Sequence, residues 1–160
     1  MTALFTPLSI KDITFKNRIG MSPMCQYSST DGIASDWHMV HLGARAVGGV
    51  GLIMSEATAV SAQGRISAGC AGLWNEQQAE KLEPIVAFQK SYGAVTGTQI
   101  GHSGRKGSAQ TALKGGNHLS DADGGWQTVS ATEQLFDPTG DRLWRKPMAL
   151  RVRDIIEIQE

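Results

Sequence analysis

The chain lacks a charge imbalance and a long apolar run, and these two absences exclude several classes of function. Its 160 residues carry 15 basic and 15 acidic side chains, so nothing in the composition predicts binding to nucleic acid or to an anionic membrane surface. Apolar runs such as Leu52–Met54 are far shorter than the ~20 residues that cross a bilayer. With 41% hydrophobic residues, the composition predicts one folded domain rather than a disordered chain.

Cysteine is also scarce, which bears on the cellular compartment. Cys25 and Cys70 are too few for a disulfide framework and too far apart for a Cys-x-x-Cys motif, a usage typical of a reducing environment. At the N-terminus, Lys11 and Asp12 interrupt the chain before the apolar core of a secretory signal can develop. We therefore expect a cytoplasmic protein.

The common cofactor and hydrolase signatures are absent as well. The sequence contains no Gly-x-Gly-x-x-Gly, no phosphate-loop motif, no His-Glu-x-x-His and no Gly-x-Ser-x-Gly. Glycine, in contrast, is in excess, with 19 of 160 residues against an average usage of about 7%. Many of these glycines end apolar runs, so they divide the chain into structural elements.

A hairpin and three strands are predicted from the pattern of apolar residues. Residues 8–15 alternate apolar with polar side chains around a short turn, which predicts a β-hairpin with one face to bury. Further strands are expected near 19–24, 50–60 and 94–101. The segment 50–60 is rich in apolar residues without clean alternation, as in a strand of a parallel sheet that is covered on both faces.

Two helices are expected between these strands. The first begins at Ser35 or Asp36 and ends at the Gly48-Gly49 pair, while the second begins at Asn75 and is expected to break at Pro84. Strands and helices therefore alternate along the chain. This order predicts an α/β fold with a parallel sheet, either doubly wound or closing into a barrel.

The last third of the chain differs from the rest. Residues 103–147 are rich in Gly, Ser, Asp and Thr, and only Trp126–Val129 is strand-like, so we expect a long loop, which is usually functional. A third helix is predicted to start at about residue 150. Since no glycine or proline terminates it, we expect this helix to be cut short rather than complete at residue 160.

Polar and reactive side chains gather where the predicted strands end. They occur in 22–27 after the first strand, in 56–58 within the second and in 99–106 after the third. Because the carboxyl ends of parallel strands share one edge, where α/β proteins bind ligands, the sequence predicts a binding site there.

Within these clusters, single residues allow two interpretations. Cys25 is either a buried small apolar residue or part of the site, and Tyr27 is either a packed aromatic or a phenolic donor to a ligand. Gln99 at a buried strand end needs partners for both ends of its amide, since an unsatisfied buried amide costs about 1–3 kcal/mol. A ligand with a paired donor and acceptor would provide them.

Two groups of basic side chains likewise allow two interpretations. His38 and His41 are spaced to share one face of the first helix, as metal ligands sometimes are, but no third ligand is evident and we predict no metal site. His102, Arg105 and Lys106 form either a solvated rim or a cationic edge for an anionic cofactor.

Several segments together resemble the N-terminal part of the Old Yellow Enzymes, and the resemblance covers nearly the whole chain. The cysteine that follows Pro-Met, with a tyrosine two residues later, is similar to the thermophilic-like branch, which includes xenobiotic reductases. The matching segments are Leu4–Pro7, Lys16–Ile19, Met21–Tyr27, Trp37–His41, Gly51–Val60, Gln63–Ile66 and Gln99–Lys106.

This resemblance implies a flavin-dependent ene reductase built on a (β/α)8 TIM barrel, a homo-oligomer at full length. FMN would take hydride from NAD(P)H and pass it to an activated C=C bond of an α,β-unsaturated small molecule. Catalytic roles would fall to Cys25, which tunes the flavin potential, and Tyr27, which contacts the substrate, whereas Trp37, His38 and His41 would be structural. The flavin would contact Ser22, Pro23, Met24, Cys25, the backbone of Ala57 and the amide of Gln99.

Departures from the family pattern leave two further interpretations open. A complete barrel needs ~250 residues and eight strands, whereas 1–160 supplies three, and the family's substrate-anchoring pair and phosphate site belong to later strands. The isolated chain is therefore expected to be inactive, and it can instead be a non-catalytic fragment with weak or no flavin binding. A flavodoxin-like module fits the strand order but lacks a phosphate loop after the first strand.

Overall fold

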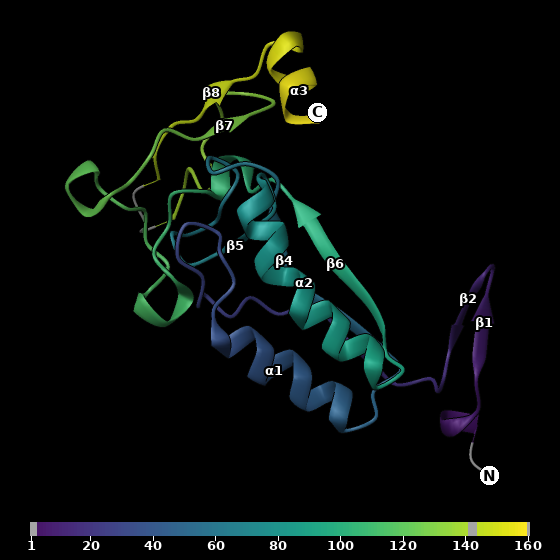
Figure 1. The fold of residues 1–160 in the computed structure, drawn as a ribbon. Coiled ribbons are helices and arrows are strands. Elements are labelled where there is room, and N and C mark those ends of the chain that lie inside the picture. Colours follow the sequence, from purple (N-terminus) through teal and green to yellow (C-terminus); the bar gives the residue numbers. More distant parts are fainter. Residues whose placement is uncertain (1–2, 141–143, 160) are drawn as a thin grey trace.

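A four-stranded parallel sheet forms the centre of the molecule. The computed structural model describes residues 3–140 and 144–159, and Figure 1 shows the sheet behind two helices. The longest strand pairs with two short strands on one side and with a long strand on the other, and all pairings are parallel. The strands are β3 (Gly20–Met21), β4 (Leu52–Ala59), β5 (Ala71–Gly72) and β6 (Val95–Gly101).

The pairing of β4 with β6 sets the register of the sheet. Leu52 lies opposite Val95, and Ala59 lies opposite Gly101, so the predicted parallel arrangement of these segments is confirmed. Sequence reasoning missed β5, which has only two residues. Within the part of the chain that the structure describes, β6 pairs with β4 alone, and its other edge is open.

Helices α1 (Asp36–Val47) and α2 (Glu76–Ser91) lie side by side over one face of the sheet (Figure 1). Both begin at predicted capping residues. The Ser35 amide donates to Nδ1 of His38 at 3.0 Å, and Oδ1 of Asn75 accepts from the Gln78 amide at 3.0 Å. These contacts satisfy donors that have no partner inside the helix.

The predicted break of the second helix at Pro84 is wrong, because α2 is continuous through it. Proline lacks the N–H that would bond to the carbonyl of Glu80. Both Pro84 and Glu80 are exposed, so water can solvate that carbonyl. Continuing the helix also buries Ile85 and Gln89, and this burial offsets the missing backbone bond.

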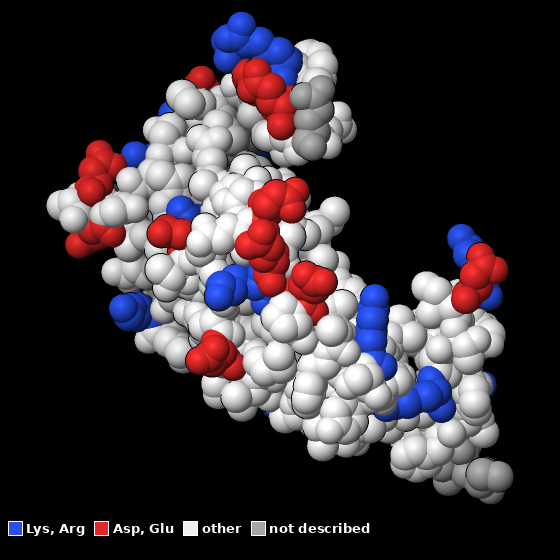
Figure 2. Space-filling model, in the orientation of Figure 1, with Lys and Arg blue, Asp and Glu red and all other residues white. Residues whose placement is uncertain are grey.

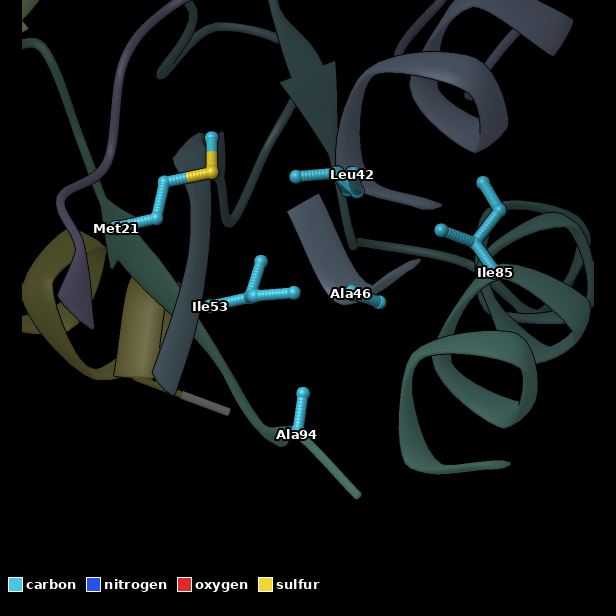
Figure 3. Packing of buried hydrophobic residues seen from close by; sticks show 6 residues of the cluster. All are labelled: Met21, Leu42, Ala46, Ile53, Ile85 and Ala94. Atoms are coloured by element: carbon cyan, nitrogen blue, oxygen red, sulfur yellow. The ribbon is translucent and has the colours of Figure 1, made fainter. Parts of the chain in front are cut away.

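The hydrophobic core lies between the sheet and these two helices. Figure 3 shows Ile53 of β4 and Met21 of β3 facing Leu42 and Ala46 of α1, with Ile85 of α2 beside them. The side chain of Ile53 is fully buried. Burying a side chain of this size stabilises a fold by about 1.5–3 kcal/mol, so this cluster fixes both helices on the sheet.

The N-terminal hairpin stands apart from the sheet in Figure 1. Its strands β1 (Leu8–Ile10) and β2 (Ile13–Phe15) pair antiparallel, and a short 3-10 helix, Ala3–Phe5, precedes them. Ile10 and Ile13 are both exposed. Leu8 and Phe15 on the same face are half-buried, so the described residues cover this face only in part, and its burial stays a prediction.

The last third of the chain forms a layer over the carboxyl end of the sheet (Figure 1). The strand expected at Trp126–Val129 is mostly wrong, because β7 begins only at its last residue. The indole of Trp126 instead donates to the carbonyl of Gln63 at 3.0 Å. The elements are three 3-10 turns (Gly104–Lys106, Ala112–Lys114 and Asp121–Asp123), the parallel pair β7 (Val129–Ser130) and β8 (Met148–Ala149), and helix α3 (Val152–Gln159).

The surface carries charges of both signs. In Figure 2, Lys and Arg as well as Asp and Glu side chains are spread over the visible face, with several acidic side chains grouped near its centre. None of the helices within residues 3–140 and 144–159 combines the length and the apolar character needed to cross a membrane.

Candidate active site

The carboxyl end of the sheet brings the predicted site residues together. Ala57 of β4 lies opposite Gln99 of β6, and both border a cavity of about 160 Å³ that Cys70 and His102 also line. The thiol of Cys25, in the segment after β3, lies close to the backbone of Ala57. Cys25, Ala57 and Gln99 thus meet at one rim although they are far apart in the sequence.

A β-bulge in β4 decides which side chains reach this rim. Ser55 lies opposite Thr98, but the next pair is Ala57 with Gln99, so Glu56 is an extra residue in β4. Ser55 and Glu56 both line a small cavity against α1. Two consecutive residues therefore face the helices, and Ala57 is turned to the opposite face. Bulges commonly re-aim side chains in this way next to functional sites.

The irregular segment from Met24 to Tyr27 changes direction at Tyr27, and we call it the Tyr27 turn; it is held through Gln26. The backbone amide of Gln26 donates to Oε2 of Glu56 at 2.9 Å. Its side-chain amide donates to the carbonyl of Met24 at 2.8 Å and accepts from the indole of Trp37 at 3.0 Å. These bonds hold Tyr27 at φ 52°, a left-handed conformation that costs a non-glycine residue about 1–2 kcal/mol.

A second loop packs against the backbone of the same turn. The Ser29 amide donates to the carbonyl of Gly69 at 3.1 Å. A Cβ atom at position 69 would lie 2.7 Å from the carbonyl oxygen of Tyr27, which real Cβ contacts do not reach. Glycine at this position therefore permits the close approach, and Tyr27 is supported from two sides.

The thiol and the phenol of this turn are both kept neutral. Burial raises the pKa of the Cys25 thiol, and the neighbouring Cys70 and Glu56 raise it further. Burial likewise raises the pKa of Tyr27, with a further contribution from Cys25. A protonated phenol can donate a hydrogen bond to a ligand oxygen. A neutral thiol is a weak nucleophile, so the site is arranged for contact rather than for covalent attack by sulfur.

Three of the predicted site residues have exposed side chains. Ser22, Met24 and Gln99 are exposed. Within residues 3–140 and 144–159, neither the Ser22 hydroxyl nor the Gln99 amide has a hydrogen-bond partner among protein side chains and backbone. Pro23, which lies between Ser22 and Met24 in the segment after β3, is half-buried. Of these residues, Gln99 lines the cavity at the rim, whereas Met24 borders the small cavity against α1.

His38 and His41 have different environments although both lie on α1. The ring of His38 is buried and bonds to Glu56 at 3.1 Å, whereas His41 stacks on Trp37 with ring centroids 5.8 Å apart. Burial lowers the pKa of His41. Among the described residues, no three His, Cys, Asp or Glu side chains come together as metal ligands would.

Two of the basic residues after β6 contact the long loop. Arg105 donates to the Thr132 hydroxyl at 3.1 Å, and the Lys106 ammonium lies 5.4 Å from the centroid of Phe136. His102 instead accepts from the Gly104 amide at 3.0 Å through Nδ1, and burial lowers its pKa. Only His102 of the three lines the cavity with Gln99.

Sequence reasoning placed Glu56 and Gln26 in polar clusters but gave no role to them or to Arg65. Glu56 is a carboxylate in an apolar strand, and a buried charge needs partners, so this signal was present in the sequence. Arg65 lines the cavity with its guanidinium between the rings of Trp74 and Trp126, at 5.6 and 5.3 Å from their centroids. No sequence pattern indicates that sandwich, because its members come from distant segments.

The fold and the rim agree with one family. The chain matches the NADH:flavin oxidoreductase / NADH oxidase family over residues 3–159, and it belongs to that family. The resemblance to the Old Yellow Enzymes and the predicted fold class, an α/β N-terminal part of a TIM barrel, are thereby confirmed.

Individual relatives show how much of the family's length this chain spans. An NADPH dehydrogenase of Bacillus cytotoxicus is 48% identical over 112 residues, which cover 69% of this chain and 32% of that protein. An NADH:flavin oxidoreductase of Gibberella zeae is 44% identical over 160 residues, which cover 99% of this chain and 38% of that protein. The structure of the Old Yellow Enzyme homologue from Zymomonas mobilis is 26% identical and has a TM-score of 0.76, covering 98% of this chain and 42% of that one. The chain thus spans about a third of the length of these curated relatives.

Proposed function

We propose that residues 1–160 form the flavin-ring side of an NAD(P)H-dependent ene reductase that uses FMN. The observation that carries this proposal is the meeting of Cys25, Ala57 and Gln99 at the carboxyl rim of one parallel sheet. When bound, FMN would accept hydride from NAD(P)H and deliver it to an activated C=C bond of an α,β-unsaturated small molecule. The family match supports the class of enzyme.

The groups at the rim fit a flavin ring by their chemistry. The pyrimidine edge of an isoalloxazine carries both hydrogen-bond acceptors and a donor, and the unpartnered amide of Gln99 offers one of each. The exposed hydroxyl of Ser22 can serve either role. Ala57 has a side chain small enough to let a flat ring approach the backbone. We assign Ser22, Pro23, Met24, Cys25, Ala57 and Gln99 to cofactor binding.

Cys25 and Tyr27 are the residues of this chain that we assign to catalysis. The Cys25 thiol is neutral and half-buried, so it can tune the electronics of a neighbouring ring without reacting with it. The Tyr27 phenol keeps its proton and can donate to a substrate oxygen. The bonds through Gln26 hold both residues in one turn.

The test uses lumiflavin, which has the flavin ring but no phosphate, together with FMN. We expect both to perturb the NMR amide signals of Cys25 and Ala57 and the side-chain amide of Gln99 in residues 1–160, with similar weak affinities. Gln99→Ala should weaken lumiflavin binding by about tenfold, since one lost hydrogen bond of roughly 1.4 kcal/mol changes a constant tenfold.

Gln77→Ala is the matched control, because Gln77 is exposed on α2. It should leave lumiflavin binding unchanged. Signal changes confined to other parts of the sheet, or equal effects of the two substitutions, would contradict the proposed site.

A further inference from the structure

Glu56 is a buried carboxylate at the centre of the bulge in β4, with a side chain only 3% exposed. Two donors from different elements converge on it. The Gln26 amide donates to Oε2 at 2.9 Å, and Nε2 of His38 lies 3.1 Å from Oε1. A carboxylate is an acceptor at both oxygens, so both donors are satisfied by one side chain.

The ring of His38 is oriented for this contact by the start of α1. The Ser35 amide donates to Nδ1 at 3.0 Å, a shorter contact than the 3.3 Å between Nδ1 and the Ser35 carbonyl oxygen, so we take Nδ1 as the acceptor and Nε2 as the protonated ring nitrogen. Nε2–H is therefore the donor to Glu56. The chain of contacts runs from the N-terminus of α1 through His38 and Glu56 to the amide that lies between Cys25 and Tyr27.

We propose that Glu56, held by His38, is the positioning residue of the site, and that its bond to the Gln26 amide fixes Cys25 and Tyr27 at the rim. The geometry requires a carboxylate. A glutamine at position 56 has one acceptor oxygen and could satisfy only one of the two donors, while its amide nitrogen would face the other. The bulge is what brings residue 56 to the side of α1.

Glu56 acts through the turn and touches no ligand in this assignment. The inference deepens the proposed function and rests on it only for the statement that Cys25 and Tyr27 face a flavin and its substrate. Its test needs no flavin. A chain that fails to bind lumiflavin, yet shows the expected exchange at the Gln26 amide and the expected alkylation of Cys25, would overturn the proposed function and leave the positioning role intact.

The first measurement is NMR on residues 1–160. The ring nitrogens of His38 should show the neutral tautomer with the proton on Nε2. In Glu56→Gln, hydrogen exchange at the Gln26 amide should be at least tenfold faster, while exchange at the amide of Ile53 in β4 stays as in the parent chain. Equal acceleration at both amides would reduce Glu56 to general support of the fold and overturn the proposal.

The second measurement is the pH profile of alkylation by iodoacetamide, resolved by mass spectrometry at Cys25 and Cys70. Because Glu56 raises the pKa of Cys25, Glu56→Gln should move the Cys25 midpoint to lower pH. Buried Cys70 reports unfolding of the whole domain and should stay unreactive. An unchanged Cys25 midpoint would contradict the assignment.

A pair of substitutions at His38 keeps the test decisive if Glu56→Gln does not fold. The side-chain amide of His38→Gln can still donate to Glu56, whereas His38→Leu cannot. We expect exchange at the Gln26 amide to be close to that of the parent chain in the first variant and at least tenfold faster in the second. Identical behaviour of the two variants would overturn the role of His38.

Discussion

Ala57 of β4 lies opposite Gln99 of β6 only because Glu56 is an extra residue in its strand. Without the bulge, the alternation of a regular strand would turn Ala57 toward α1. One residue thus decides both which group reaches the rim and which carboxylate reaches the helix.

The contact of Gly69 with Tyr27 predicts a steric cost. Gly69→Ala should lower the free energy of unfolding by about 1–3 kcal/mol, as overpacking usually does, because the new Cβ would lie 2.7 Å from the Tyr27 carbonyl oxygen. Urea unfolding measures the loss. Gly101→Ala is the control, since a Cβ there meets nothing within 4 Å, and equal losses in both variants would refute the steric explanation.

His102 predicts how stability depends on pH. Burial lowers its pKa, so the unfolded chain takes up this proton at a higher pH than the folded chain. The stability that neutral His102 adds to the folded chain is complete above the ordinary histidine pKa of about 6.5, and it is lost as the pH falls below that value. The urea midpoint should therefore decrease from pH 7 to pH 5.

His102→Asn separates this titration from the hydrogen bond. The asparagine carbonyl can accept from the Gly104 amide as Nδ1 does, but it does not titrate. The variant should be close to the parent chain at pH 7 and lose less stability at pH 5. Part of the dependence should remain, because burial also lowers the pKa of His41 and His118. An identical pH profile in the variant would show that His102 does not contribute.

The contacts at the rim predict weak cofactor binding by residues 1–160 alone. The assigned residues all address the flavin ring, and each charge-assisted phosphate bond that is not made forgoes roughly 1.5–3 kcal/mol, or at least tenfold in affinity. The purified chain should be colourless and should not reduce cyclohexenone with NADPH. A yellow, active preparation free of any longer enzyme would contradict this.

Cys25 predicts a change of potential rather than a loss of cofactor. In an FMN-loaded protein that contains this segment, Cys25→Ala should shift the flavin midpoint potential and the balance of the two half-reaction rates while FMN stays bound. The reason is that a sulfur beside the ring changes its electronics without anchoring it. Spectroelectrochemistry measures the shift, and complete loss of FMN would make Cys25 a structural residue instead.

Local signals made much of the fold predictable. The Asn75 cap, the Gly48-Gly49 end of α1 and the apolar run of β4 are properties of neighbouring residues, and the structure has each of them. The break predicted at Pro84 was wrong because the rule that proline ends a helix considers neighbouring residues alone. The burial of Ile85, which keeps α2 continuous, depends on the distant sheet.

The candidate site was predictable at the level of strand ends but not of contacts. The parallel order of the strands was enough to expect the segments 22–27, 56–58 and 99–106 at one edge, and the family resemblance singled out Cys25, Ala57 and Gln99 within them. No particular residue pattern marks the bulge at Glu56 in the sequence. The partners of Glu56, Gln26 and His38, come from two other segments. Such a network is defined only by the packing of β4 against α1, so no spacing in the sequence indicates it.

The open edge of β6 makes self-association of this chain depend on its concentration. Its backbone groups on that side pair with no strand within the described residues, and Ile100 beside them is 64% exposed. An edge of this kind accepts a strand from any source. A strand from a second copy of the chain is one such source. Dilution therefore favours single copies, and crowding favours sheets that continue from one molecule to the next.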